Sequence, residues 1–373
     1  MTHSVFSCYA AAAFGLEGLV SDELRRLGLA DVHAENGGVR FSADPAGLLN
    51  ANLKCRFCDR IYISLAEETC TTFEALYQLV FRIPWERYAS GTEFFHLSCK
   101  CVRSKLMSPR DCQSVSKKAL LERLRKQTAR TRFPESGAEL PILISIHQDW
   151  TRILLNTSGV SLSRRGYRTW NGEAPLRETL AAALVQLSPW RPGLPLHDPC
   201  CGTGTILVEA ALMMTGRASG INRSFAMESF SFLDPGLSSR VRSCCASPAS
   251  ENVLSSISGS DLDPEALKLA RRHTRQAGVD QLVQLDCIPL QELRLNGASG
   301  VFICNPPYGE RMDSAAECRK LYRDLALLRQ RHPGWSLCAI TSDPAFERAF
   351  GKRADKKRRL YNGRLECTYY IYD

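Results

Sequence analysis

The spacing of apolar residues along the chain predicts three successive arrangements of helices and strands. Over residues 5–60 the patterns follow the order strand, helix, strand, helix. The stretch "LEGLVSDELRRLG" places leucine and valine at helical spacing and ends at Gly28, a residue that favours a helix stop. The stretch "DPAGLLNANL" opens with Asp44 and a proline, a combination typical of a helix start.

Residues 61–160 predict a second module of mixed helices and strands. The apolar runs "RIYISLAEE", "EFFHLSCKCV", "LPILISIHQD" and "TRILLNTSG" predict strands. The amphipathic stretches "TTFEALYQLVFRI" and "SVSKKALLERLRKQ" predict helices. In the second of these helices the leucines form a core face, whereas Lys118, Arg125 and Lys126 fall on another side.

From about residue 172 onward, apolar strand patterns alternate regularly with helical ones. The succession of "LPLHDPCCGTGTILVEAALMMTG", "ISGSDLDPEALKLARRHTRQAG" and "SGVFICNPPYGER" predicts a mostly parallel, doubly wound sheet. Two further strand-like runs, "GWSLCAITS" and "ECTYYIYD", follow. The Ser- and Cys-rich stretch "SSRVRSCCASPASENVLSSIS" is expected to form a helix and a loop inside this same domain.

Composition narrows the class of protein. A chain of 373 residues with 44% hydrophobic and 23% charged residues is long enough for two or three domains. It has no apolar run long enough for a transmembrane helix, and its first residues lack the basic start of a signal peptide. The 16 cysteines are therefore expected to be reduced thiols of a cytoplasmic protein, with no membrane partner.

Positive charge is concentrated in one segment. The stretch Lys100–Arg132 contains 11 Lys or Arg and 2 Asp or Glu, and this surplus equals the net charge of +9 of the whole chain. A second basic run covers Lys352–Arg359. Such concentration favours a polyanionic partner, most often a nucleic acid. The residues expected to bind it are Lys100, Arg103, Lys105, Arg110, Lys117, Lys118, Arg125 and Lys126.

Five cysteines raise the question of a metal. Cys55 and Cys58 have the spacing of a zinc-binding pair, and Cys99, Cys101 and Cys112 follow further along the chain. The second pair has one intervening residue in place of two. Small buried thiols are the favoured interpretation, so no metal site is expected.

A glycine-rich turn between a predicted strand and a predicted helix marks a ligand site. In "HDPCCGTGT", Gly202 and Gly204 permit a tight turn and close approach of the backbone to a ligand. The chain lacks the lysine-containing loop that clamps nucleoside triphosphates. Asp198 ends the strand, which suits a ligand that carries an amine, such as the methionyl part of S-adenosylmethionine.

A second acid follows the next predicted strand. Asp261 in "GSDLDPEAL" can accept hydrogen bonds from both ribose hydroxyls, as in other Rossmann-type sites. The alternative role for Asp261 is a helix cap. Asp263 precedes a proline and is the better candidate for that cap.

These motifs together resemble a known family. "DPCCGTGT", "GSDLDP" and "NPPYGER" are similar to class I S-adenosylmethionine-dependent methyltransferases that modify exocyclic amines of nucleic-acid bases. "GVSLSRRGYRTWNGEAPLRETLAAAL" and "GINRSFAMESF" resemble bacterial RNA guanine-N2 methyltransferases of the RlmL/YpsC type. The resemblance implies a ferredoxin-like region at 1–60, a THUMP RNA-binding domain at 61–160 and a Rossmann-like methyltransferase domain with a seven-stranded sheet at 161–373.

The resemblance also implies a set of cofactor-binding residues and two departures from the family pattern. Cys200 stands where the family usually has methionine, and Pro289 stands where it has an acid near the adenine amino group. The adenine hydrogen bond is then absent, made by backbone, or made by Asp286. The cofactor-binding set is Asp198, Cys200, Gly202, Gly204, Asp261, Leu262, Asp286 and Asn305.

The run Asn305-Pro306-Pro307-Tyr308 is the predicted catalytic motif. The lone pair of an exocyclic amine is delocalised into the base, so two acceptors that hold its hydrogens help to aim it. The Asn305 side chain and the Pro306 carbonyl can supply them, with the backbone held by consecutive prolines, and Tyr308 offers a stacking face. Catalysis of this kind relies on orientation and fixed dipoles.

The leading hypothesis is an enzyme that methylates guanine N2 in 23S rRNA or in a large-subunit assembly intermediate. A tRNA guanine-N2 methyltransferase and a DNA adenine-N6 methylase are the alternatives among enzymes. An RNA-binding ribosome assembly factor without activity is the alternative from another class. The basic α+β module favours RNA over DNA.

Overall fold

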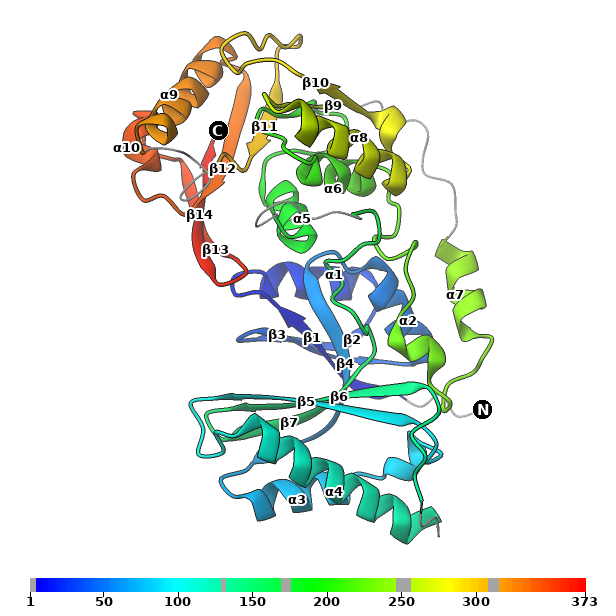
Figure 1. The fold of residues 1–373 in the computed structure, drawn as a ribbon. Coiled ribbons are helices and arrows are strands. Elements are labelled where there is room, and N and C mark those ends of the chain that lie inside the picture. The colour runs from blue at the N-terminus through cyan, green and yellow to red at the C-terminus, as the bar shows by residue number, and fades with distance from the viewer. Residues whose placement is uncertain (1–4, 129–131, 169–175, 246–255, 308–314) are drawn as a thin grey trace. The chain divides into compact units, whose positions relative to one another are not determined.

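The computed structural model describes residues 5–128, 132–168, 176–245, 256–307 and 315–373 (Figure 1). Contacts divide the chain into two compact units. The first unit comprises Met1–Ala12, Val20–Leu162 and Arg223–Ala246, and the second comprises Ala13–Leu19, Ser163–Asn222 and Ser247–Asp373. Each unit contains a seven-stranded sheet.

The sheet of the first unit has the strand order β2-β3-β1-β4-β7-β6-β5. The first helices and strands along the chain are β1 (Phe6–Ala12), α1 (Glu17–Arg26), β2 (Ala30–Glu35), β3 (Gly38–Ala43), α2 (Pro45–Lys54) and β4 (Cys58–Thr69). The predicted helix start is confirmed, because the Asp44 side chain caps α2 by accepting a hydrogen bond from Gly47 N at 2.7 Å. Strand β2 was not predicted; its six residues, "ADVHAE", lack the apolar alternation of a half-buried strand.

The remaining elements of the first unit follow β4. They are α3 (Phe73–Arg82), a 3₁₀ turn (Trp85–Arg87), β5 (Phe94–Val102), α4 (Pro109–Thr128), β6 (Glu139–His147), β7 (Trp150–Asn156), a 3₁₀ turn (Ala226–Ser229) and α7 (Leu237–Cys245). Strand β4 pairs with β1 through its first half and with β7 through its second half. The predicted boundary between residues 60 and 61 therefore falls inside one continuous strand.

Helix α7 lies in the Ser- and Cys-rich stretch that was expected to belong to the third domain. It contacts α2, and the segment Arg223–Ala246 is grouped with the first unit. The Asn52 side chain on α2 donates hydrogen bonds to Thr157 Oγ1 at 3.1 Å and to Met227 Sδ at 3.6 Å. Three segments far apart in sequence thus meet at the buried side chain of Asn52.

The sheet of the second unit has the order β10-β9-β8-β11-β12-β14-β13. Its strands are β8 (Leu196–Asp198), β9 (Ile257–Ser260), β10 (Val283–Asp286), β11 (Gly300–Cys304), β12 (Trp335–Thr341), β13 (Lys356–Asn362) and β14 (Leu365–Tyr372). Strands β10 through β12 pair in parallel, and β14 pairs antiparallel with β12 and β13. The predicted mostly parallel, seven-stranded sheet is confirmed.

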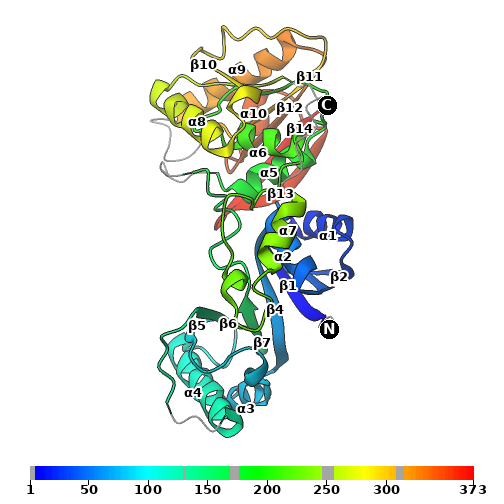
Figure 2. The ribbon, with the colours of Figure 1, turned by 90° about the vertical axis from the view of Figure 1, so that its right-hand side faces the viewer.

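The helices of this unit are α5 (Glu178–Leu187), α6 (Thr205–Met214), α8 (Pro264–Ala277), α9 (Ala315–Arg331) and α10 (Phe346–Phe350), with a 3₁₀ turn at Asp280–Leu282. Helix α6 contacts both α5 and α8 (Figure 2). Among the described residues, no helix is both long and apolar enough to span a membrane.

Both faces of the central strands are buried, which explains their continuous apolar runs. Phe302 of β11 and Leu337 of β12 pack in one cluster with Tyr322 of α9 and Phe346 of α10. On the opposite face of β14, the Tyr369 hydroxyl donates a hydrogen bond to the Leu184 carbonyl of α5 at 2.9 Å. This packing of helices against both faces is the doubly wound arrangement expected from the sequence.

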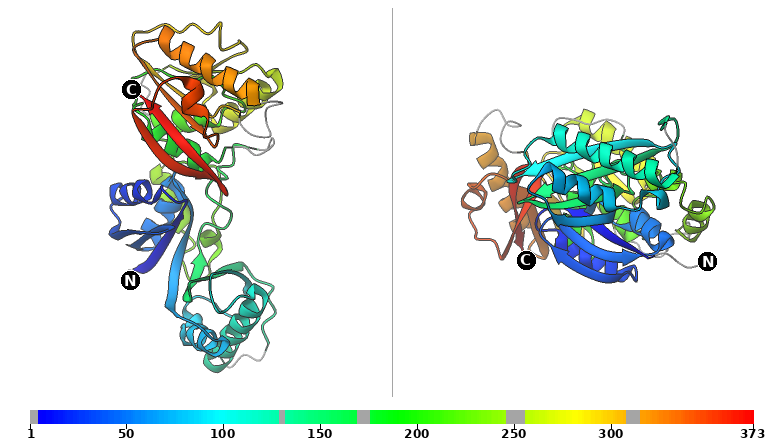
Figure 3. Two further views of the ribbon diagram at one scale, coloured as in Figure 1. Left: turned by 90° about the vertical axis from the view of Figure 1, so that its left-hand side faces the viewer. Right: turned by 90° about the horizontal axis from the view of Figure 1, so that it is seen from below.

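The second half of the second basic run lies in a strand. Four of its residues lie in β13, which forms a hairpin with β14 (Figure 3, red). Lys356 pairs with Asp373 at 2.9 Å and Lys357 pairs with Glu347 at 2.5 Å. Part of this positive charge is therefore neutralised within the second unit.

Candidate active site

Four polar side chains follow neighbouring strands of the second sheet at the same edge. Asp286 ends β10, Asp261 follows β9, Asp198 ends β8 and Asn305 follows β11. These strands are parallel, so their carboxyl ends lie together. The chain order reverses between β8 and β11, and ligands of doubly wound sheets bind at such a switch point. Asp198 and Asn305 lie on either side of it.

The glycine-rich turn after β8 needs both of its glycines for the backbone it adopts. Gly202 has φ of 50° and Gly204 has φ of 79°, both in the left-handed region. A side chain at Gly202 would meet no atom within 4 Å, whereas at Gly204 it would approach the Ala270 side chain of α8 to 3.1 Å. Gly202 thus faces open space that a ligand can approach, and Gly204 permits α6 and α8 to pack closely.

The two acids after β9 have separate roles. The Asp261 carboxylate accepts hydrogen bonds from Gly202 N at 2.7 Å and from Asp263 N at 3.0 Å. Asp263 is the N-cap of α8 and accepts from Glu265 N at 2.8 Å, as predicted. Asp261 therefore links the end of β9 to the glycine-rich turn and is not the cap of α8.

Asp198 is a buried acid, with only 1% of its surface exposed. Burial raises its pKa well above the ordinary value; the hydrogen bond from Cys200 N, at 3.1 Å, acts in the opposite direction, and the nearby Asp261 carboxylate raises the pKa further. An isolated buried carboxylate is unfavourable unless a cation or a donor compensates it. Asp198 is consequently suited to bind a positively charged group of a ligand.

The residues next to Asp261 and Asp286 complete the edge of the site. Leu262 is 68% exposed, unusual for an aliphatic side chain beside buried strands. Asp286 is exposed, and its backbone carbonyl accepts from Asp261 N at 3.3 Å. Pro289 lies in the following turn, where its carbonyl accepts from Glu292 N at 3.0 Å. The assignment of the adenine contact to Asp286 stays a prediction.

Asn305 carries an unsatisfied polar atom. Its Oδ1 is buried and has no hydrogen-bond partner among the described residues. Pro306 is buried and Pro307 is half-buried, so the backbone after β11 is held firmly. Buried acceptors without partners are rare and are expected where a ligand supplies the donor. Tyr308, the last residue of the predicted motif, lies outside the described residues.

Residues before α5 also support the site, although the sequence had not singled them out. Arg168 donates a hydrogen bond to the Thr205 hydroxyl in the first turn of α6 and pairs with Glu178 of α5 at 3.5 Å. Tyr167 donates to Glu209 of α6 at 3.0 Å. These contacts fix the helix that follows the glycine-rich turn. In the sequence, the run "SRRGYR" could have pointed to these residues, because its charged side chains need partners wherever they are buried.

The predicted RNA-binding residues all lie in the first unit, on β5, on α4 and in the loop between them. Lys117 pairs with Glu135 at 2.5 Å, and Lys118 lies 4.0 Å from Glu122. Arg125 and Lys126 are exposed and lie over aromatic rings at 5.9 and 4.9 Å from the ring centres. The remaining four are also exposed: Lys100, Arg103, Lys105 and Arg110. Their role stays a prediction.

Comparison with known protein families assigns three segments of the chain. Residues 7–62 match the RlmL ferredoxin-like domain, and residues 70–156 match the THUMP domain. Residues 165–371 match the methyltransferase domain described as RMKL-like.

Full-length relatives cover nearly the whole chain. The "Putative RNA methyltransferase YpsC" of Bacillus subtilis is 36% identical over 369 residues, which is 98% of this chain and 96% of that protein. The crystal structure of SMU.472, described as "a putative methyltransferase complexed with SAH", has a TM-score of 0.93 and 39% identity, covering 99% of this chain and 98% of that one. A structure described as "a predicted N6-adenine-specific DNA methylase from Listeria monocytogenes str. 4b F2365" has a TM-score of 0.94 and 36% identity, covering 99% and 96%.

The doubly wound sheet with its glycine-rich turn and the acids at its carboxyl edge defines a class I, S-adenosylmethionine-type methyltransferase fold. The protein is a methyltransferase. The chain belongs to the RMKL-like methyltransferase family, with an RlmL ferredoxin-like domain and a THUMP domain preceding the catalytic one.

Proposed function

We propose that this protein transfers a methyl group from S-adenosylmethionine to the exocyclic N2 amine of a guanosine in RNA, with 23S rRNA as the leading target. The observation that carries the proposal is the buried Oδ1 of Asn305, which has no hydrogen-bond partner among the described residues and lies at the switch point beside Asp198. An amine N–H is the donor that this acceptor lacks.

The residues at the sheet edge fit the proposed cofactor. Its ammonium group would compensate the buried Asp198, and its ribose hydroxyls would bind Asp261. The open space at Gly202 admits the ligand close to the backbone, and exposed Leu262 offers an apolar surface to the adenine ring. When bound, the cofactor supplies an electrophilic methyl group on a sulfonium.

The catalytic role of the protein is to orient the amine. Asn305 Oδ1 and the Pro306 carbonyl accept hydrogen bonds from the two amine hydrogens, so the nitrogen lone pair is directed at the methyl group. Such fixed dipoles act strongly in a site that excludes water. Tyr308 stacks on the base in this proposal. The target guanosine is unpaired or flipped out when it enters the site.

RNA is favoured over DNA because the chain carries a THUMP domain with its positive charge on α4 and the preceding loop. One relative is described as an RNA methyltransferase, which supports an RNA substrate. Another is described as an adenine-specific DNA methylase, which supports the competing hypothesis of a DNA substrate. A tRNA guanine-N2 methyltransferase and an inactive ribosome assembly factor are two further hypotheses. A cytoplasmic location accords with the 16 free cysteines.

Nucleoside mapping by mass spectrometry tests the proposal. The rRNA, tRNA and genomic DNA of a strain that lacks the protein are compared with those of the same strain complemented with wild type or with Asn305→Ala. Loss of one N2-methylguanosine from 23S rRNA, restored by wild type alone, is the expected result. An unchanged rRNA map together with a changed tRNA or DNA map would overturn the choice of target. Unchanged maps in all three nucleic acids would favour the inactive assembly factor.

A further inference from the structure

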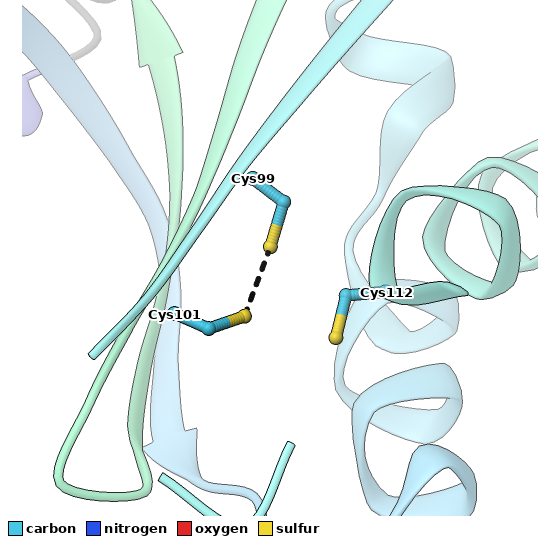
Figure 4. Close-up of side chains that lie close together, drawn as sticks. All are labelled: Cys99, Cys101 and Cys112. Carbon is cyan, nitrogen blue, oxygen red and sulfur yellow. Dashed lines mark hydrogen bonds between the residues drawn. The ribbon is translucent and has the colours of Figure 1, made fainter. Parts of the chain in front are cut away.

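Three thiols converge inside the first unit, away from the methyltransferase site. Cys99 and Cys101 lie two residues apart on β5, so their side chains leave the same face of the strand. Cys112 faces them from the first turns of α4 (Figure 4). The sulfurs of Cys99 and Cys101 are 3.6 Å apart, and all three sulfurs lie within 4.8 Å of one another. Cys55 and Cys58, which have the spacing of a zinc-binding pair, are not part of this group.

The spacing of the sulfurs suits a single metal ion. Three points within 4.8 Å of one another enclose a centre that is no more than about 2.8 Å from each, whereas a zinc–sulfur bond is about 2.3 Å. Side-chain shifts of roughly half an ångström would therefore close the coordination shell. Among the described residues, no further His, Cys, Asp or Glu joins this group.

We infer that Cys99, Cys101 and Cys112 form a binding site for one thiophilic metal ion of the Zn²⁺ or Cu⁺ kind. Three thiolates alone satisfy Cu⁺ in a trigonal arrangement, and Zn²⁺ would add water as a fourth ligand. Each thiol releases its proton to solvent as its sulfur binds the metal. The ion would join β5 to α4, the helix that carries most of the predicted RNA-binding residues.

The three thiols lie in a largely buried part of the first unit. Cys112 is fully buried, and the residues that pair with Cys99 and Cys101 in the neighbouring strand, Ile144 and Ile146, are buried too. Cys112 lies near the N-terminus of α4, where the helix dipole stabilises negative charge on sulfur.

A disulfide is the competing outcome for three close cysteines. Residues two apart on a strand have Cβ atoms separated by roughly 6.6 Å, whereas a disulfide needs about 3.8 Å. Cys99 and Cys101 therefore do not pair with each other. A bond from either of them to Cys112 is the disulfide that the experiment must distinguish from metal binding.

Metal titration of the full-length protein tests the site. The reduced, metal-free protein is titrated under anaerobic conditions with Zn²⁺ and, separately, with Cu⁺, each in competition with a chromophoric chelator. One equivalent per chain is expected for at least one of the ions, and the tighter ion identifies the occupant. Cys112→Ser is expected to weaken binding by at least about tenfold, the loss that even an outer-shell change can cause.

Matched variants make the result decisive. Cys70→Ser changes a buried thiol of the same domain outside the group and is expected to leave metal binding unchanged. Cys101→Ser changes a half-buried group member, so it serves if Cys112→Ser fails to fold. Equal metal binding by Cys101→Ser and wild type would overturn the site. Absence of binding by the reduced wild type would overturn it too, as would a Cys112 disulfide that forms in air when Zn²⁺ is present.

Discussion

Asn305 is the residue for which geometry and proposed chemistry agree most directly. Its buried Oδ1 atom has no hydrogen-bond partner among the described residues, and the amine of the substrate would supply the N–H donor. We expect Asn305→Ala to reduce the rate of methyl transfer by about 10²–10³-fold, the usual effect of removing one fixed dipole from an active site. Cofactor affinity, measured by calorimetry, should change much less than this rate.

The control for this prediction is Asn296→Ala, at an exposed position of the second unit. It should leave both the rate and the affinity near wild type. A similar fall in rate for both variants would show that the loss at Asn305 reflects general instability.

Asp198 provides a prediction about pH. Because its pKa is raised in the cofactor-free protein, acidification protonates Asp198 at a higher pH than an ordinary Asp, whose pKa is about 3.9. A protonated Asp198 no longer attracts the cofactor ammonium, so affinity should fall as the pH is lowered, starting well above that value. Calorimetry over a pH series measures the effect.

The variant Asp198→Asn should bind the cofactor weakly and lose this pH dependence, whereas exposed Asp280→Asn should keep it. The same raised pKa has the opposite consequence for stability. Protonated Asp198 favours the cofactor-free fold, and this contribution is lost as the pH rises through its folded-state pKa. Affinity that stays constant into the ordinary Asp range would contradict the assignment.

At the scale of elements, the packing of α6 on α8 depends on Gly204. A side chain there would meet Ala270 at 3.1 Å and would also require a left-handed backbone. We expect Gly204→Ala to lower the free energy of unfolding by about 1–2 kcal/mol for the backbone and by about 1–3 kcal/mol more for overpacking. Chemical denaturation of the full-length protein measures the loss.

Gly216→Ala is the matched control, because Gly216 has φ of 64° but no atom within 4 Å of the added side chain. It should show the backbone loss without the packing loss. Equal destabilisation by the two variants would mean that the contact between α6 and α8 contributes little to the free energy of unfolding.

The division into two units matters at the scale of the whole molecule. Residues 223–246 belong to the first unit although they follow the glycine-rich turn in sequence. Deleting residues 1–160 would remove α2 and leave α7 without its packing partner. Point variants are therefore the sound way to separate RNA binding from catalysis in this protein.

The positive charge of α4 gives the corresponding prediction. Lys118 and Arg125 are seven residues apart and share one helix face, and both are exposed. Replacing both with Ala should weaken RNA binding and reduce the slope of log affinity against log salt by about 0.7–0.9 for each phosphate that is no longer neutralised. Filter binding at several salt concentrations measures this slope.

Arg275→Ala on α8 removes an exposed charge from the other unit and should leave the slope unchanged. Cofactor affinity should be unaffected in both variants. A slope that does not respond to the α4 variant would show that other residues hold the RNA.

The sequence by itself determined the features that depend on local pattern. Period-2 and helical spacing located most strands and helices, and the Asp-Pro pairs placed the caps of α2 and α8 correctly. The order of strand and helix patterns determined the doubly wound sheet, because parallel strands require crossover connections. The same order placed the polar residues of the candidate site at the ends of predicted strands.

Only the tertiary structure decided what depends on contacts between distant segments. The edge strands β2 and β13 lack the apolar pattern of the central strands, because an edge position leaves much of their surface exposed. The continuity of the sheet through β4 was likewise decided by the tertiary structure. The sequence named five cysteines as possible metal ligands, and the structure brings only Cys99, Cys101 and Cys112 of these together. Spacing along a chain reports which side of its own element a residue faces, whereas the element that it meets is set by how the whole chain folds.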